Sequence, residues 1–151
     1  MSKNQIYFNS SPSHTIGVEL ELQILDKNTL ELSPSAPKIL KDNSGDLRIK
    51  EELLDSIIEI NTNICNTIDD VRTDLSTTLK KVLKSADKHN LCLLSMGTHP
   101  YSHWADQIIS NHPRYHSLIN RFQWPLRRLL ITGVNVHIGV NSGEKAIAIT
   151  N

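Results

Sequence analysis

The 151-residue sequence has few cysteines, no surplus of charge of either sign and no long apolar run. Lysine plus arginine equals aspartate plus glutamate at 16 each, so the formal net charge is zero. Because nucleic-acid-binding proteins usually present a basic surface, nucleic acid is not expected as the main partner. No apolar stretch approaches the roughly 20 residues of a membrane-spanning helix, so no membrane association is expected.

Only two cysteines occur, Cys65 and Cys92, and both lie in apolar, strand-like segments. The opening segment, MSKNQIYFNSSPSH, is polar and lacks the apolar core of a signal peptide. Without a secretion signal, we expect both thiols to be reduced and buried and the protein to be cytoplasmic. Residues 1–14 are expected to be disordered or flexible.

Several familiar ligand-binding motifs are missing. The sequence has six glycines but no glycine-rich P-loop and no GxGxxG fingerprint, so any nucleotide would be bound by other means. His103, His112 and His116 lack the close pairing of a zinc site. Cys65 has no histidine beside it in sequence and is read as a core residue.

The segment TIGVELELQILD, residues 15–26, shows what is present. Apolar residues alternate with Gly17, Glu19, Glu21 and Gln23, which is the two-residue period of a strand with one buried face. Glutamate is a poor strand former, and two on one face repel each other. This pattern raises the question of whether the two carboxylates share a task or simply meet water.

The rest of the chain alternates strand-like and helix-like segments. Thr67 with Asp70 three residues later is a capping signal for a long helix. We expect further strands at 53–63, 91–97 and 134–140, and further helices beginning near Pro37, Pro113 and residue 142. This order predicts an α+β fold in which helices cover one face of a sheet.

The polar faces of three predicted strands carry the candidate site. Glu59 and Asn61 belong to the second long strand, and Asn135 and His137 to the last one. If these strands are neighbours of the first, Glu19, Glu21, Glu59 and His137 converge on one surface. Such a group would repel unless it held a cation, and oxygen ligands with one imidazole suit Mg²⁺ or Mn²⁺.

Two interpretations of this surface stay open. It could bind a nucleotide–metal complex, or it could be the solvated face of an antiparallel sheet in a non-catalytic interaction fragment or relic. Thr98 and His99 lie in a loop after a strand, a common place for ligand contacts.

Four segments of the sequence, taken together and in order, resemble a known family. They are TIGVELELQILD, ELLDSIIEINTNIC, SMGTHPYSHW and RYHSLINRFQWPLRRLLITGVNVHIGV, spread from residue 15 to near the end of the chain. Together they resemble the type 2 glutamate–cysteine ligases, also called carboxylate–amine ligases.

The resemblance implies a glutamine synthetase-like fold, a curved and mainly antiparallel sheet with helices on one face. It implies an ADP-forming ligase that uses ATP as co-substrate and Mg²⁺ or Mn²⁺ as cofactor. Glutamate's γ-carboxylate is phosphorylated, and the amine of cysteine, or of another small amine, attacks the acyl phosphate. The same general fold serves guanidino kinases, so the acceptor stays open.

By motif, the resemblance assigns Glu19, Glu21 and Glu59 to metal binding and places His137 beside the nucleotide–metal site. It places Thr98 and His99 of the GTHP block in substrate binding.

One position departs from the family pattern. Asn135 stands where many relatives carry the first histidine of a His-x-His pair, and we assign it to substrate binding.

The family enzymes are usually more than twice as long as this chain. Residues 15–151 therefore correspond to the N-terminal part of a catalytic domain, and the predicted fold is incomplete. We expect the chain to be inactive or very weak alone and to associate with a complementary C-terminal chain or with a second copy.

Overall fold

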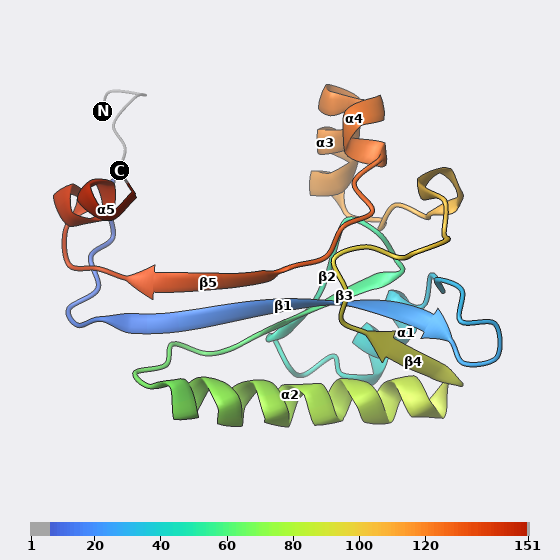
Figure 1. Ribbon diagram of the computed structural model, residues 1–151, viewed down its shortest axis with the longest axis horizontal. Helices are drawn as coiled ribbons and strands as arrows, with labels where there is room; N and C mark the ends of the chain where they lie inside the picture. Colours follow the sequence, from blue (N-terminus) through green and yellow to red (C-terminus); the bar gives the residue numbers. More distant parts are fainter. Residues whose placement is uncertain (1–6, 151) are drawn as a thin grey trace.

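The computed structural model describes residues 7–150. Five strands and five helices, together with one 3₁₀ turn at Trp104–Asp106, form the fold of this segment (Figure 1). In chain order the elements are β1 (Thr15–Asp26), α1 (Ala36–Asp42), β2 (Ile49–Glu51), β3 (Ile57–Asn61), α2 (Ile68–Lys88), β4 (Leu91–Leu94), α3 (Pro113–Phe122), α4 (Trp124–Arg127), β5 (Val134–Gly139) and α5 (Gly143–Thr150).

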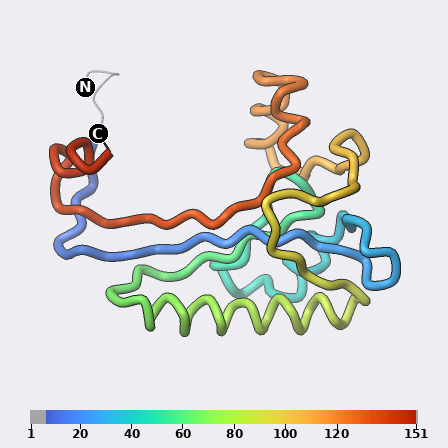
Figure 2. The backbone as a smooth tube through the Cα atoms, viewed as in Figure 1, coloured from blue at the N-terminus to red at the C-terminus, as the bar shows by residue number. Residues whose placement is uncertain are grey.

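The long strand β1 organises the sheet. One edge of β1 pairs with β3, which in turn pairs with β2, and every pair is antiparallel. The other edge pairs with β5 along Thr15–Leu20 and with β4 along Gln23–Asp26. Figure 2 shows β5 running beside β1 although more than a hundred residues separate them in the sequence.

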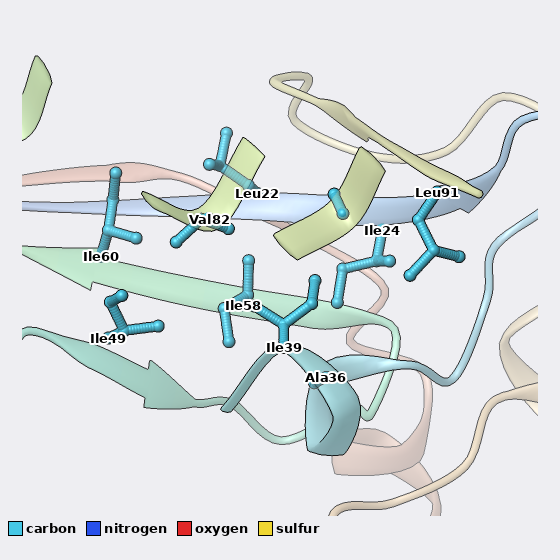
Figure 3. Packing of buried hydrophobic residues seen from close by; sticks show 10 residues of the cluster. Leu22, Ile24, Ala36, Ile39, Ile49, Ile58, Ile60, Val82 and Leu91 are labelled. Atoms are coloured by element: carbon cyan, nitrogen blue, oxygen red, sulfur yellow. The ribbon is translucent and has the colours of Figure 1, made fainter. Parts of the chain in front are cut away.

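The apolar face of the sheet packs on α2 and α1. The two-residue period of β1 directs Leu22 and Ile24 to this face, where they join residues of α1, β2, β3, α2 and β4 (Figure 3). The core cluster consists of Leu22, Ile24, Ala36, Ile39, Ile49, Ile58, Ile60, Val82, Ala86 and Leu91. The predicted α+β class with a mainly antiparallel, open sheet is confirmed.

The predicted start of α2 is also confirmed. The Thr67 hydroxyl accepts a hydrogen bond from the Asp70 N–H at 3.1 Å, and the Asp70 carboxylate accepts one from the Thr67 N–H at 2.9 Å. These reciprocal bonds form a capping box. Hydrogen bonding of the Asp70 carboxyl to the Thr67 side chain and to the Asn66 and Thr67 N–H groups holds its pKa below the usual value.

Removing this cap gives a first testable prediction. Thr67→Ala is expected to lower the free energy of unfolding by about 1 kcal/mol, because the Asp70 N–H loses its acceptor. Thr67→Ser keeps the hydroxyl and is the matched control. Urea denaturation followed by circular dichroism measures both, and equal stability of the two variants would show that the cap contributes nothing.

The prediction of one strand over 53–63 is wrong at its start. Residues 54–57 form a tight turn closed by a bond from the Ile57 N–H to the Leu54 carbonyl, so the strand begins only at Ile57. The short strand β2 just before it was not predicted.

The sheet has helices on both sides, whereas the prediction placed helices on one face only. The α3–α4 pair stands on the side of the sheet opposite α2, beside the polar face of β1 (Figure 1).

Residues 1–6 of the predicted flexible N-terminus lie outside the described residues, and the Ser11 N–H donates to the Val140 carbonyl. The predicted boundary at residue 15, between a flexible N-terminal segment and the domain, stays a prediction.

Two further properties concern the described part of the chain. Both cysteines are free thiols, as predicted, and Cys65 is buried, whereas Cys92 is only half-buried and not buried as predicted. None of the helices within residues 7–150 is long and apolar enough to span a lipid bilayer.

Candidate metal and nucleotide site

The strand register brings the predicted polar residues onto one face of the sheet. Glu21 lies directly opposite Glu59, and Glu19 lies opposite Asn61 on one side and Asn135 on the other. Directly opposed residues of antiparallel strands project to the same face. The strand pairing therefore confirms that the polar faces of β1, β3 and β5 converge.

Three carboxylates form the tightest group on this face. One carboxylate oxygen from each of Glu21, Glu52 and Glu59 lies within 4.8 Å of the others. Glu59 is buried, with 8% of its surface exposed, and Glu21 and Glu52 are half-buried. We call Glu21, Glu52 and Glu59 the acidic cluster.

Hydrogen bonds hold each member of the acidic cluster in place. Glu21 accepts from the Gly133 N–H at 2.8 Å, which fixes it to the segment leading into β5. Glu52 accepts from the Leu53 N–H at 2.7 Å. Glu59 accepts from the Asn61 amide at 2.7 Å, and the Lys50 ammonium lies 3.7 Å away. Lys50 and the charge that Arg114 exerts on Glu52 do not balance three carboxylates.

The acidic cluster shifts the titration of two of its members. Burial is the main cause that raises the pKa of the Glu21 carboxyl, and the charges of Glu52, Glu59 and Glu19 raise it further against the Gly133 bond. Burial likewise raises the pKa of the Glu52 carboxyl. Their ionised forms are therefore costly in the folded chain unless a cation is present.

Glu19 and His137 form a second group beside the acidic cluster. The His137 Nε2 atom lies 3.1 Å from a Glu19 carboxylate oxygen, while His137 itself lies opposite Gly17 in the register. The four predicted ligands thus share a face but divide into two groups: Glu21 and Glu59 join Glu52, and Glu19 pairs with His137. Their role as metal ligands stays a prediction.

A cavity of about 370 Å³ opens beside the acidic cluster. Glu21 and Glu52 line it together with Asn135 and with Arg114 and Tyr115 from the first turns of α3. The Tyr115 hydroxyl donates to the Glu51 carbonyl at 3.2 Å, and burial raises the pKa of this phenol to about 12. Arg114 brings a permanent positive charge to a cavity whose floor is acidic.

The three residues predicted to bind substrate have different positions. Asn135 lines the cavity with Glu21. Thr98 and His99 do not line it: the Thr98 hydroxyl donates to the Leu130 carbonyl at 2.7 Å, and the buried His99 accepts from the Ser102 N–H at 3.3 Å. These bonds shape the loop after β4. The assignment of Asn135, Thr98 and His99 to substrate binding stays a prediction.

Glu52 is the site residue that the sequence did not reveal. It follows the unpredicted strand β2 within the run IKEELLDS, where a charged segment looks like an ordinary solvated turn. Its position seven residues before Glu59, across the tight turn at residues 54–57, places it beside Glu59. No periodicity could have found it, because it lies outside a regular strand.

Comparison with known proteins decides the family. The sequence profile described as "Glutamate-cysteine ligase family 2 (GCS2)" matches residues 15–151. This chain belongs to glutamate–cysteine ligase family 2. Family membership confirms the resemblance seen in the four sequence blocks, and it covers nearly the whole chain.

Two relatives show how much of a family protein this GCS2 chain represents. A Thermobifida fusca protein named "Putative glutamate--cysteine ligase 2" is 40% identical over 152 residues, covering 97% of this chain and 38% of its own length. A Gloeobacter violaceus protein with the same name is 37% identical, covering 97% and 40%. The GCS2 chain thus spans about two fifths of these relatives.

A solved structure shares the fold. The crystal structure of glutamate–cysteine ligase from Francisella tularensis in complex with AMP matches with a TM-score of 0.65 at 14% identity. The match covers 96% of this chain and 30% of that one. At this identity the likeness shows the fold alone, which agrees with the predicted ligase fold class.

Proposed function

We propose that this chain forms the metal-binding part of an ATP-dependent carboxylate–amine ligase of the glutamate–cysteine type. Family membership supports the reaction class, and the AMP complex of the Francisella tularensis structure supports nucleotide binding. The observation that carries the proposal is the acidic cluster, in which one oxygen from each of three carboxylates lies within 4.8 Å of the other two.

The acidic cluster suits a hard divalent cation. Mg²⁺ and Mn²⁺ prefer carboxylate oxygens, and Mg²⁺ in proteins is commonly held by a few carboxylates together with substrate phosphates. Glu21, Glu52 and Glu59 would hold the ion, and Glu19 with His137, on the same face of the sheet, would offer a second position. The bound ion would neutralise phosphate charge, which is the main demand in phosphoryl transfer.

The proposed reaction has two steps. The γ-phosphoryl group of ATP passes to the γ-carboxylate of glutamate and ADP leaves; the amine of cysteine, or of another small amine, then attacks the acyl carbon and phosphate leaves. Arg114 is placed at the cavity to attract an anionic group of a substrate, and Asn135 can hydrogen-bond one. We further propose a cytoplasmic location.

Metal binding should begin to weaken at a higher pH than binding by ordinary carboxylates would. The raised pKa values of Glu21 and Glu52 mean that protons compete with the cation above the usual carboxyl range. We expect Mn²⁺ affinity, measured by isothermal titration calorimetry, to begin to fall while the pH is still above the ordinary carboxyl value of 4.5. An affinity that falls only below that value would contradict the assignment of these two residues.

The same shifts set the sign of the effect on the metal-free chain. A carboxyl whose pKa is higher in the folded state than in the unfolded state binds its proton more tightly when folded. The contribution of Glu21 and Glu52 to stability is therefore favourable at low pH and is lost as pH rises through their raised pKa values. Saturating Mn²⁺ should reverse this trend.

Turnover tests the reaction itself. The purified chain with Mg²⁺, ATP, glutamate and cysteine is expected to release little or no ADP, because it spans only about two fifths of its relatives. Turnover at the rate of a full-length family enzyme would show that the matched two fifths of the relatives' length suffices for activity.

A further inference from the structure

Gln23 of β1 is a buried polar residue that the proposed reaction does not use. Only 1% of its surface is exposed, and it follows Glu21 in the row of polar side chains on the face of the acidic cluster. Its Oε1 atom is buried without a hydrogen-bond partner among the described residues. Burying an unpaired polar atom is unfavourable, and a leucine would occupy a similar volume without that cost. Stability alone therefore does not account for a glutamine at this position.

The amide nitrogen of Gln23 holds two segments that are far apart in the sequence. Its Nε2 atom donates to the Met96 carbonyl at 3.1 Å and to the Thr132 hydroxyl at 3.0 Å. The Thr132 hydroxyl in turn donates its single hydrogen to the Met96 carbonyl, so it must accept from Gln23. The orientation of the amide is thereby fixed, with the nitrogen toward both segments. An ionised glutamate could make neither bond.

Gln23 lies beside a break in the sheet. One edge of β1 pairs with β5 as far as Leu20 and with β4 only from Gln23 onward, which leaves a break between the two strands. Met96 follows the end of β4 and Thr132 precedes the start of β5, so Gln23 ties both segments that leave the break back to β1. The two segments also bond to each other, from the Thr132 N–H to the Gly97 carbonyl at 3.0 Å.

The break is also the place where the chain meets a proposed metal ligand. The residue after Thr132 is Gly133, whose N–H donates to the Glu21 carboxylate at 2.8 Å and whose carbonyl accepts from the Glu21 N–H at 3.1 Å. A hydrogen bond from an N–H favours the ionised carboxylate, which is the form that binds a cation. Thr132 and Gly133 both line the cavity beside the acidic cluster. The position of the Glu21 carboxylate therefore depends on where these two residues lie.

We propose that Gln23 is a positioning residue of the metal site: by holding Thr132 to β1, it keeps the Gly133 N–H against the Glu21 carboxylate. The inference rests on the proposed function, because it takes Glu21 to be a metal ligand. Gln23 is not among the described residues that line the cavity, so it acts on the ion through Glu21 and not as a ligand.

Replacing Gln23 by leucine tests the positioning. In Gln23→Leu the Thr132 hydroxyl still donates to the Met96 carbonyl, so neither group loses its last partner and the melting temperature should change little. The Gly133 amide should nevertheless exchange its hydrogen at least about tenfold faster in the metal-free chain, and Mn²⁺ should bind about tenfold more weakly. Hydrogen-exchange NMR and isothermal titration calorimetry measure these effects. A merely structural role would alter the melting temperature and leave the Mn²⁺ affinity unchanged.

Thr132 offers a second variant, which also tests the inference if Gln23→Leu does not fold. Thr132→Val removes the hydroxyl that accepts from Gln23 and should weaken Mn²⁺ binding by a similar factor, whereas Thr132→Ser keeps the hydroxyl and should bind normally. If Gln23 acts through Thr132, the combined Gln23→Leu and Thr132→Val change should weaken binding no more than the stronger single change. Ser85→Ala is the matched control, because it removes a buried side-chain bond to Asp42 from α2 and should leave Mn²⁺ binding unaltered.

The outcomes separate this inference from the proposed function. Absence of Mn²⁺ binding by the original chain would overturn the proposed function, together with the inference that rests on it. Mn²⁺ binding that Gln23→Leu and Thr132→Val leave unaltered would overturn only the inference about Gln23, as would a Gly133 amide that exchanges at the original rate in both variants.

Discussion

Glu21→Gln is expected to weaken Mn²⁺ binding at least about 100-fold, since losing even a residue that only orients a metal ligand commonly costs 10- to 100-fold. Glutamine keeps the size of the side chain and can still accept the Gly133 N–H bond, so the position of β5 should be retained. Calorimetry or electron paramagnetic resonance of Mn²⁺ measures the loss.

The metal-free Glu21→Gln variant should be as stable as the original chain at neutral pH, or more stable. Burial and three neighbouring carboxylates make the ionised form of Glu21 costly, and glutamine removes that cost. Glu31→Gln, at an exposed glutamate in the turn after β1, is the matched control and should change neither property. If Glu21→Gln binds Mn²⁺ normally, Glu21 is no ligand.

This pair of measurements also separates the metal site from a solvated acidic face. A face that merely meets water would show no saturable Mn²⁺ binding in the original chain, whatever the variants do. Loss of binding in both Glu21→Gln and Glu52→Gln, with no loss of metal-free stability, requires that the two side chains meet at one ion.

Ile58→Ala should give the largest loss of stability. Ile58 is fully buried in β3 and belongs to the core cluster between the sheet, α1 and α2. Truncating a buried isoleucine to alanine costs about 2–5 kcal/mol, from lost burial and from the cavity left behind. Urea denaturation should show this loss, and because Ile58 adjoins Glu59, the variant should also bind Mn²⁺ more weakly.

Two control substitutions show whether the loss comes from truncating a buried side chain. Ile58→Val should cost about 1 kcal/mol, because only one methylene is lost. Ile64→Ala should cost less than about 0.5 kcal/mol, since Ile64 is largely exposed. A loss below about 1 kcal/mol for Ile58→Ala would mean that this part of the core is loosely packed.

The strand periods predicted most of the candidate site. Alternation in β1 and β5 and the odd positions of β3 placed Glu19, Glu21, Glu59 and His137 on one face on the condition that the three strands are neighbours, and the strand pairing meets that condition. The register then decided which residues meet. Glu21 faces Glu59 directly, whereas His137 is displaced along β5 and meets Glu19.

Other features depended on tertiary structure that the sequence does not express. Glu52 joins the acidic cluster because a tight turn folds it back toward Glu59, and β2 is too short for its period to be visible. Similarly, the place of α3 beside the acidic cluster depends on Tyr115, whose hydroxyl reaches the Glu51 carbonyl.

The central claim is that a divalent cation binds among Glu21, Glu52 and Glu59. Crystals of the chain soaked in Mn²⁺ and measured near the manganese absorption edge test it most directly. An anomalous difference peak in contact with these three carboxylates is the predicted result. A map with no peak there, from crystals saturated with Mn²⁺, would contradict it.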